Sequence, residues 1–164
     1  MIDLTGLALR SLACLLCAGL CTAVSVAHAA EPVLKCNFSK AYKADPRQGP
    51  ALSAAAQGAL KEIPLDAVQF IDKAITRKVL VQGLYARRSG VDTVEVIARL
   101  INCTDHPLQV EGRTAFMDAA QIPTEPTSAW QRVFLAPRAT GIYREISTAN
   151  QGVANFLVEL REGT

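Results

Sequence analysis

Histidine and aromatic residues are scarce in this chain of 164 residues, which has 2 histidines, 1 tryptophan and 5% aromatic residues. Outside the apolar N-terminal segment, His106 is the one histidine, and it stands in the turn sequence Asp105-His106-Pro107. We therefore expect a solvated turn residue, not the base of a Ser-His-Asp or Cys-His pair. The sequence also has no phosphate-binding Gly-rich loop and no G-x-S-x-G motif.

Cysteine is equally scarce beyond the first thirty residues, where only Cys36 and Cys103 occur. Two cysteines and one histidine without paired spacing do not form a known zinc motif, so we expect no metal and no cofactor. In an oxidising compartment, such an even pair is a candidate disulfide. Two alternatives stay open, because the sequence does not give the Cα separation: each cysteine is a small apolar residue, or Cys36 lies on an arm that never meets Cys103.

An excess of charge of one sign is missing as well, since 17 basic and 15 acidic residues give a net charge of +2. This balance is too even for electrostatic binding to nucleic acid. Paired carboxylates for hydrolysis would have to converge from distant strands, and none stands out by its position. We interpret Asp118, Glu125 and Glu145 as solvated edge or loop residues, which makes a carboxylate-dependent hydrolase the weaker alternative.

The chain does have one long apolar run, at its N-terminus. Arg10 precedes an uncharged stretch, Ser11 to Ala30, that contains the small-residue sequence Ala27-His28-Ala29. This layout is typical of a secretory signal peptide that is cleaved after Ala29. We expect residues 1–29 to be removed on export, and a periplasmic protein without a membrane span to remain.

Two alternatives for the leader stay open. If it is not cleaved, the twenty residues from Ser11 to Ala30 are just long enough to cross a bilayer as one helix. If the protein is a lipoprotein, its lipid would be attached to a leader cysteine. Cys14, Cys17 and Cys21 all match the attachment pattern poorly.

Residues 30–62 differ in character from the sequence that follows them. They contain the turn signal Asp45 to Pro50 and then an Ala-rich stretch. Ala51 to Leu60 suits a short helix, weakened by Gly58 and by the lack of large apolar residues. We predict a partly ordered N-terminal arm over 30–62 and a folded domain over 63–161.

From Ile63 onward the apolar residues alternate with polar ones, which predicts half-buried strands. Val94, Val96, Ala98 and Leu100 share one face, and Leu108 with Val110 and Phe156 with Val158 repeat the pattern. Shorter predicted strands are 67–71, 79–87, 130–135 and 141–147. Turn residues at 89–92 and 104–107 predict two tight hairpins. About seven short strands at this spacing favour an all-β fold, an immunoglobulin-like antiparallel sandwich.

Three segments resemble a known family. Val94 to Asp105 is similar to the pattern V-x-V-x-x-x-x-x-N-x-T/S-D of the YcfL-like bacterial envelope proteins. Leu108 to Ala119 and Ser128 to Pro137 resemble the second strand and the Trp-containing third element of that family. The resemblance covers about Ile63 to Arg161. It implies an immunoglobulin-like sandwich exported to the periplasm, usually as an outer-membrane lipoprotein, with no established activity. The arm from Glu31 to Lys61 has no counterpart in the pattern.

Binding is the use that the remaining residues favour. Trp130 is flanked by Arg113 on a neighbouring predicted strand and by Arg132, two residues on and hence on the same strand face. Tryptophan and arginine are over-represented where interfaces concentrate their energy. The alternative is that Trp130 fills the core or caps its end while the arginines bond to loop carbonyls.

A second predicted surface consists of the outward apolar residues Ile97, Ile101 and Leu157. Cys103 has the same parity as Ile97 and Ile101, so it would lie on the same face of the strand. The N-terminal arm would therefore cover this face if Cys36 pairs with Cys103. Together these features lead us to expect a non-catalytic binding or assembly module of the bacterial envelope, with an envelope protein as its partner. An accessory of a trans-envelope secretion apparatus is the alternative within the same class.

Overall fold

The computed structural model describes residues 36–38, 50–54, 57–89, 92–149 and 152–164. The predicted signal peptide, residues 1–29, lies outside these described residues, and so does most of the predicted turn sequence before Pro50. In the part of the chain that the structure does describe, no helix is both long and apolar enough to cross a membrane.

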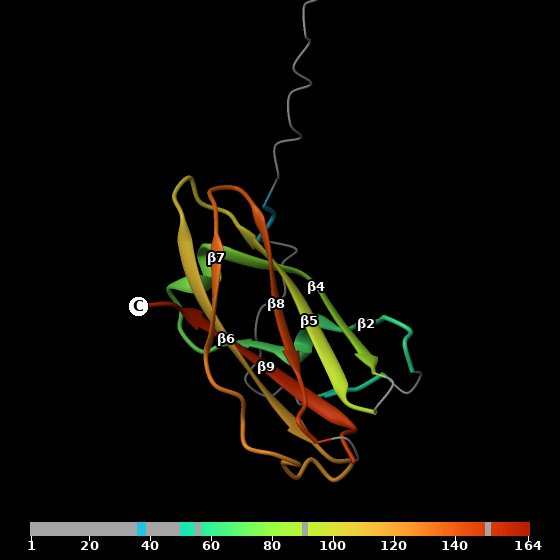
Figure 1. The fold of residues 1–164 in the computed structure, drawn as a ribbon. Coiled ribbons are helices and arrows are strands. Elements are labelled where there is room, and N and C mark those ends of the chain that lie inside the picture. The colour runs from blue at the N-terminus through green and yellow to red at the C-terminus, as the bar shows by residue number, and fades with distance from the viewer. Residues whose placement is uncertain (1–35, 39–49, 55–56, 90–91, 150–151) are drawn as a thin grey trace, which may run out of the picture. The chain divides into compact units, whose positions relative to one another are not determined.

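The described residues form nine strands and two single-turn 3-10 helices, Leu65–Ala67 and Ile75–Arg77. The strands are β1 (Ala51–Leu52), β2 (Lys61–Ile63), β3 (Val68–Phe70), β4 (Val79–Arg88), β5 (Val94–Asn102), β6 (Leu108–Met117), β7 (Gln131–Leu135), β8 (Thr140–Ile146) and β9 (Asn155–Glu162). Their arrangement confirms the predicted all-β sandwich (Figure 1).

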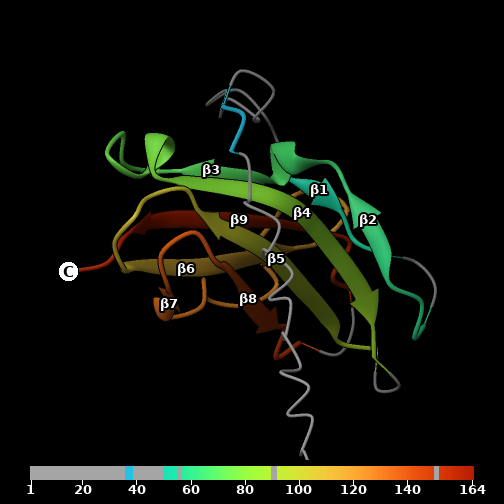
Figure 2. The same ribbon diagram turned by 90° about the horizontal axis from the view of Figure 1, so that it is seen from above.

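The strands divide into two sheets. One has the order β1-β9-β6-β7, and β3 also pairs with β9; the other has the order β2-β4-β5-β8. All pairs are antiparallel except β3 with β9, which is parallel. Figure 2 shows the strands from above, with β9, β6 and β7 following one another in their sheet. We call them the β6 sheet and the β5 sheet, after their central strands.

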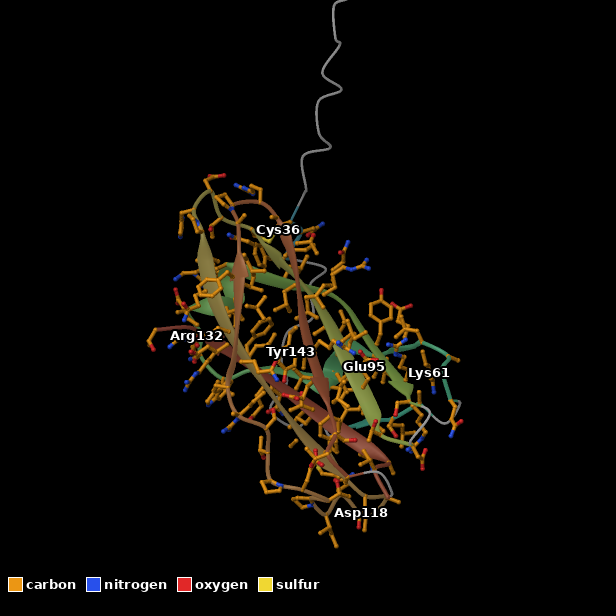
Figure 3. All side chains as sticks on the ribbon, viewed as in Figure 1. Cys36, Lys61, Glu95, Asp118, Arg132 and Tyr143 are labelled. Atoms are coloured by element: carbon orange, nitrogen blue, oxygen red, sulfur yellow. A yellow bond between two sulfur atoms is a disulfide. The ribbon has the colours of Figure 1, made fainter. Side chains whose placement is uncertain are left out.

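The core lies between the two sheets and is built from the inward set of each alternating strand. Val94, Val96, Ala98 and Leu100 of β5 are all fully buried, as their period of two predicts. Among the described residues, Tyr143 of β8 is the largest fully buried side chain, and Figure 3 labels it near the middle of the sandwich. Its ring packs against Gly112 of β6, where an added Cβ would come within 2.6 Å of the ring.

The predicted helix over Ala51 to Leu60 is wrong. Ala51 and Leu52 form β1 against β9, and Lys61 to Ile63 form β2 against β4. Exposed strand edges offered these residues backbone partners, whereas a short helix without large apolar residues has little to bury. The segment predicted as an arm thus adds one short strand to each sheet.

One of the two predicted hairpins is confirmed and the other is wrong. The turn after Arg88 joins the antiparallel pair β4 and β5, and the Ser89 N–H donates to the Thr93 carbonyl at 2.8 Å. The turn at 104–107 instead carries the chain from β5 in one sheet to β6 in the other. Hairpins and crossings between sheets use loops of similar length and composition, so the turn residues alone do not distinguish them.

The predicted disulfide between Cys36 and Cys103 is confirmed, with a Cα separation of 5.8 Å. Cys103 follows the last residue of β5, so the bond attaches the N-terminal segment to that end of the sandwich. Figure 3 shows Cys36 at this end and Asp118 at the opposite one.

Candidate functional site

The outer face of the β6 sheet carries the residues that the sequence singled out. Arg132 of β7 lies opposite Glu111 of β6, and Arg113 lies opposite Glu159 of β9. Trp130 immediately precedes β7, and the same register places it beside Arg113. All five side chains belong to the outward set of their strands, so they form one surface.

Trp130 lies half-buried on this surface with arginines on its ring. The guanidinium carbon of Arg113 is 4.5 Å from the ring centroid and that of Arg161, from β9, is 4.1 Å away. Contacts of this kind are worth about 0.5–2 kcal/mol each. The alternative in which Trp130 fills the core is wrong, because Tyr143 and smaller apolar residues occupy that space.

The arginines bond to carboxylates and not to loop carbonyls. Arg113 Nε donates to Glu159 Oε2 at 2.6 Å. Glu111 accepts from two sides, with Arg161 Nε at 2.7 Å and Arg132 Nε at 3.2 Å. The bond from Arg161 lowers the pKa of Glu111 and Arg132 adds to the shift, although loss of hydration opposes both. Because one carboxylate serves two guanidinium groups, this row carries an excess positive charge.

Arg132 lies on the predicted face, but the two arginines over the Trp130 ring are Arg113 and Arg161. Its side chain is 58% exposed at the edge of the sheet, and Figure 3 shows it on the outside of the sandwich. Phe134, two residues further along β7, is 74% exposed and points outward by the same parity. Trp130, Arg132 and Phe134 thus line the rim of the sheet in a row that we call the edge stripe.

An open apolar hollow of about 540 Å³ lies at the Phe134 end of the edge stripe. The residues that line it are Pro107, Leu108, Gln109, Phe134, Leu135, Ala136 and Pro137. Its two prolines leave no backbone N–H at those positions, and most of its other walls are aliphatic or aromatic. The hollow therefore suits an apolar side chain.

The sequence interpretation missed Arg161, Glu111 and Phe134 as members of this surface. Their outward parity was visible, because Arg161 alternates with Leu160 and Glu111 with Val110. The pairing of β6 with both β7 and β9 was not visible, since it joins segments up to 50 residues apart, as in the bond from Arg161 to Glu111. Phe134 lies two residues after Arg132, so its outward parity was visible in the same way.

The second predicted surface does not exist as one patch. Ile97 and Ile101 lie on the outer face of the β5 sheet, whereas Leu157 lies on that of the β6 sheet. Ile101, two residues before Cys103, is only 3% exposed, while Ile97 is half-buried. The disulfide places Cys36 at this end of β5, as the interpretation in which the arm covers the face requires, but residues 39–49 of that arm lie outside the described residues.

The β5 sheet has a matching charged row on its own outer face. Glu95 of β5 is 3% exposed and accepts bonds from Arg87 of β4 and Arg144 of β8. Burial alone would raise the pKa of Glu95, but the two arginines outweigh that effect and hold it below its ordinary value. Ile142 and Ile146 of β8 lie on the same face and are about half exposed.

The residues weighed for catalysis lie in separate places. Asp118 Oδ1 accepts the N–H groups of Ala120 and Ile122 at 2.8 and 2.9 Å in the turn after β6. Glu125 Oε2 accepts the Ala149 N–H at 2.6 Å, and Glu145 Oε2 accepts the Gln131 amide at 2.6 Å. These carboxylates organise local structure.

The remaining candidates for chemistry are equally dispersed. His106 is exposed in its loop, as predicted. Within the described residues, no three His, Cys, Asp or Glu side chains are grouped closely enough to hold a metal ion.

No protein-family model matches the chain, and no curated protein matches it either. Among solved structures, the cj0090 protein of Campylobacter jejuni is similar to 59% of this chain and 98% of its own, with 13% identity and a TM-score of 0.46. A DUF1425 family member from Shewanella sp. pv-4 is similar over 71% of this chain and 98% of its own, with 11% identity and a TM-score of 0.47. We take no site and no role from either structure.

Proposed function

We propose that this chain is an exported, non-catalytic protein-binding module of the bacterial envelope, which binds its partner through the edge stripe and the charged outer face of the β6 sheet. The observation that carries the proposal is the exposure of Phe134, 74%, beside Trp130 and Arg132 on the rim of one sheet. Aromatic and arginine side chains in such a cluster are the types that dominate binding energy in interfaces.

The arrangement of the surrounding residues supports binding over catalysis. The carboxylates at its centre, Glu111 and Glu159, are held by arginines and lie on a sheet face, not in a cleft. A hydrolase needs two carboxylates that flank a substrate, and Asp118, Glu125 and Glu145 each hold a structural hydrogen bond elsewhere. The carboxylate-dependent hydrolase is therefore the weaker proposal.

The envelope location rests on the leader pattern of residues 1–29 and on the resemblance of Val94 to Asp105 to the YcfL-like proteins. The Cys36–Cys103 disulfide supports it, because such bonds persist in oxidising compartments. Bracing of a trans-envelope secretion apparatus is a narrower version of the same proposal. Intact mass of the protein from periplasmic and membrane fractions tests export: a soluble species that starts at Ala30 is expected, and one that starts at Met1 contradicts it.

The binding proposal is tested by replacing Phe134 with a photoreactive phenylalanine analogue in the producing cell. Illumination is expected to crosslink a discrete envelope protein, and Arg132→Glu in the same chain is expected to abolish the crosslink. The matched control carries the analogue at Ile122, which is 61% exposed but lies in the loop after β6. Equal capture at both positions, or capture at neither, contradicts the proposal.

A further inference from the structure

The outer edge of β7 presents unpaired backbone groups. On β6, the carbonyls of Gln109 and Met117 accept bonds from the β9 side, while that of Thr114 accepts the Ser128 N–H on the β7 side. Antiparallel strands alternate the direction of their hydrogen bonds residue by residue. The register of β6 with β7 then directs the N–H and C=O groups of Arg132 and Phe134 away from β6, toward the edge.

No strand among the described residues pairs with this edge. Figure 1 shows β8 beside β7, but the contact between them runs through side chains: an added Cβ on Gly141 of β8 would meet Val133 Cγ1 at 3.3 Å. Natural edge strands are usually protected by lysine, proline or a bulge. β7, Gln131 to Leu135, contains neither lysine nor proline, and its pairing with β6 continues without a break. Its one charged side chain, Arg132, is bonded to Glu111 of β6.

Charge and shape around the edge indicate what would add to it. The outer face holds three arginines, Arg113, Arg132 and Arg161, against the two carboxylates of Glu111 and Glu159. An acidic side chain in the added strand, level with Arg132, would balance the excess charge. The apolar ring of Phe134 and the hollow beside it would receive an apolar side chain two residues away.

We infer that β7 binds an extended segment of a protein partner as an additional strand, with outward side chains in the order apolar, acidic, apolar. This inference rests on the proposed function and names the partner class for the same surface. Backbone hydrogen bonds to Arg132 and Phe134 would supply the affinity, and the side-chain pattern the specificity, as in other cases of strand addition.

The test uses the exported protein, labelled with nitrogen-15, and a synthetic capped peptide, Thr-Val-Thr-Glu-Thr-Val-Thr. The peptide is expected to shift the amide resonances of Arg132 and Phe134 and to slow their hydrogen exchange. Arg132→Glu and Phe134→Ala are each expected to weaken binding by about tenfold or more. Ile142→Ala, on the edge strand of the other sheet, is the matched control and is expected to leave binding unchanged.

A second peptide separates strand addition from side-chain docking. It carries N-methyl groups on the alternate backbone amides that would donate to β7, and it is expected to lose binding. If it binds as well as the first peptide, or if neither binds while the analogue at Phe134 still captures a partner, strand addition is overturned and the proposed function stands. If neither peptide binds and nothing is captured, both fail. Dimers that form without peptide and are lost in Phe134→Ala would make a second copy of the chain the occupant, and would also overturn the inference.

Discussion

Tyr143 places a hydroxyl group in the middle of the core, where it exchanges a hydrogen bond with Thr114 Oγ1 at 2.9 Å. Burial raises the pKa of Tyr143 to about 12 from the ordinary 10.0, because the phenolate would lose its hydration between the sheets. Between pH 10.0 and about 12, the folded chain therefore keeps the Tyr143 proton, whereas the unfolded chain releases it.

This shift predicts a loss of stability in alkali. Below pH 10 the contribution of Tyr143 is fully present, and it falls as the pH rises from 10.0 toward about 12, because only the unfolded chain releases the proton in that range. A shift of this size corresponds to a loss of up to about 3 kcal/mol. Urea unfolding of the wild type and of Tyr143→Phe at successive pH values measures it. The same slope in both proteins would contradict the assignment.

Glu95 makes the opposite prediction, at acid pH. Its pKa is lowered by Arg87 and Arg144 against the effect of burial, so its contribution is present above the ordinary 4.5 and is lost as the pH falls below that value. Glu95→Gln is expected to cost about 1–2 kcal/mol at neutral pH, a modest value because both arginines are partly exposed. The acid limb of the unfolding profile should also flatten. Glu62→Gln, on the exposed strand β2, is the control and is expected to change neither quantity.

At the scale of elements, Asn102 holds the point where β5 leaves its sheet. This residue is fully buried, and its side-chain NH2 group donates to the carbonyls of His106, Leu135 and Ala136 at 2.7, 3.2 and 3.0 Å. Its Oδ1 accepts the Thr104 N–H at 2.8 Å. One side-chain amide thus supplies hydrogen-bond partners to backbone groups in the loop that crosses to β6, at the end of β7 and in the loop that follows it.

Asn102→Ala is expected to destabilise the fold by about 3 kcal/mol or more, since it leaves several buried backbone groups without a partner. Denaturant unfolding followed by fluorescence of Trp130, which lies on β7's side of the sandwich, measures the change. Thr104→Ala is the milder comparison, because it removes a half-buried hydroxyl only. A cost below about 1 kcal/mol for Asn102→Ala would contradict this role.

The pairing of the strands could not be predicted from the sequence. The alternation of β5, β6 and β9 predicted their inward faces correctly, because side-chain direction is a local property of a strand. Which strand pairs with which depends on backbone hydrogen bonds between distant segments, and no particular residue type specifies these partners. The crossing after Asn102 and the placement of β1 and β2 on open edges were for this reason not foreseen.

For the molecule as a whole, the Cys36–Cys103 bond joins residues 67 positions apart and attaches the N-terminal segment to the sandwich. Closing a loop of that length restricts the unfolded chain and is worth up to about 4 kcal/mol. Reduction of the exported protein is expected to lower its unfolding midpoint in urea, and the double variant Cys36→Ser/Cys103→Ser is expected to be insensitive to reductant. Equal midpoints for oxidised and reduced wild type would contradict the prediction.

The candidate surface combines what could and could not be anticipated. Arg113 and Trp130 were placed together correctly, because they were assigned to neighbouring predicted strands. The second arginine over the Trp130 ring, Arg161, comes from β9, near the C-terminal end of the chain. Only the register of β6 with β9 brings its guanidinium carbon to 4.1 Å from the ring centroid. Arg132 shares the face but binds Glu111, because cross-strand neighbours lie closer than residues two apart along one strand.

Three properties could be predicted from local periodicity and composition: the all-β class, the inward residues of the long strands and the pair of cysteines available for a disulfide. The order of the strands, the open edge of β7 and the exposure of Phe134 became known with the folded structure. These properties arise from contacts between distant segments, and a local pattern of apolar and polar residues is the same whichever neighbour a strand finally takes.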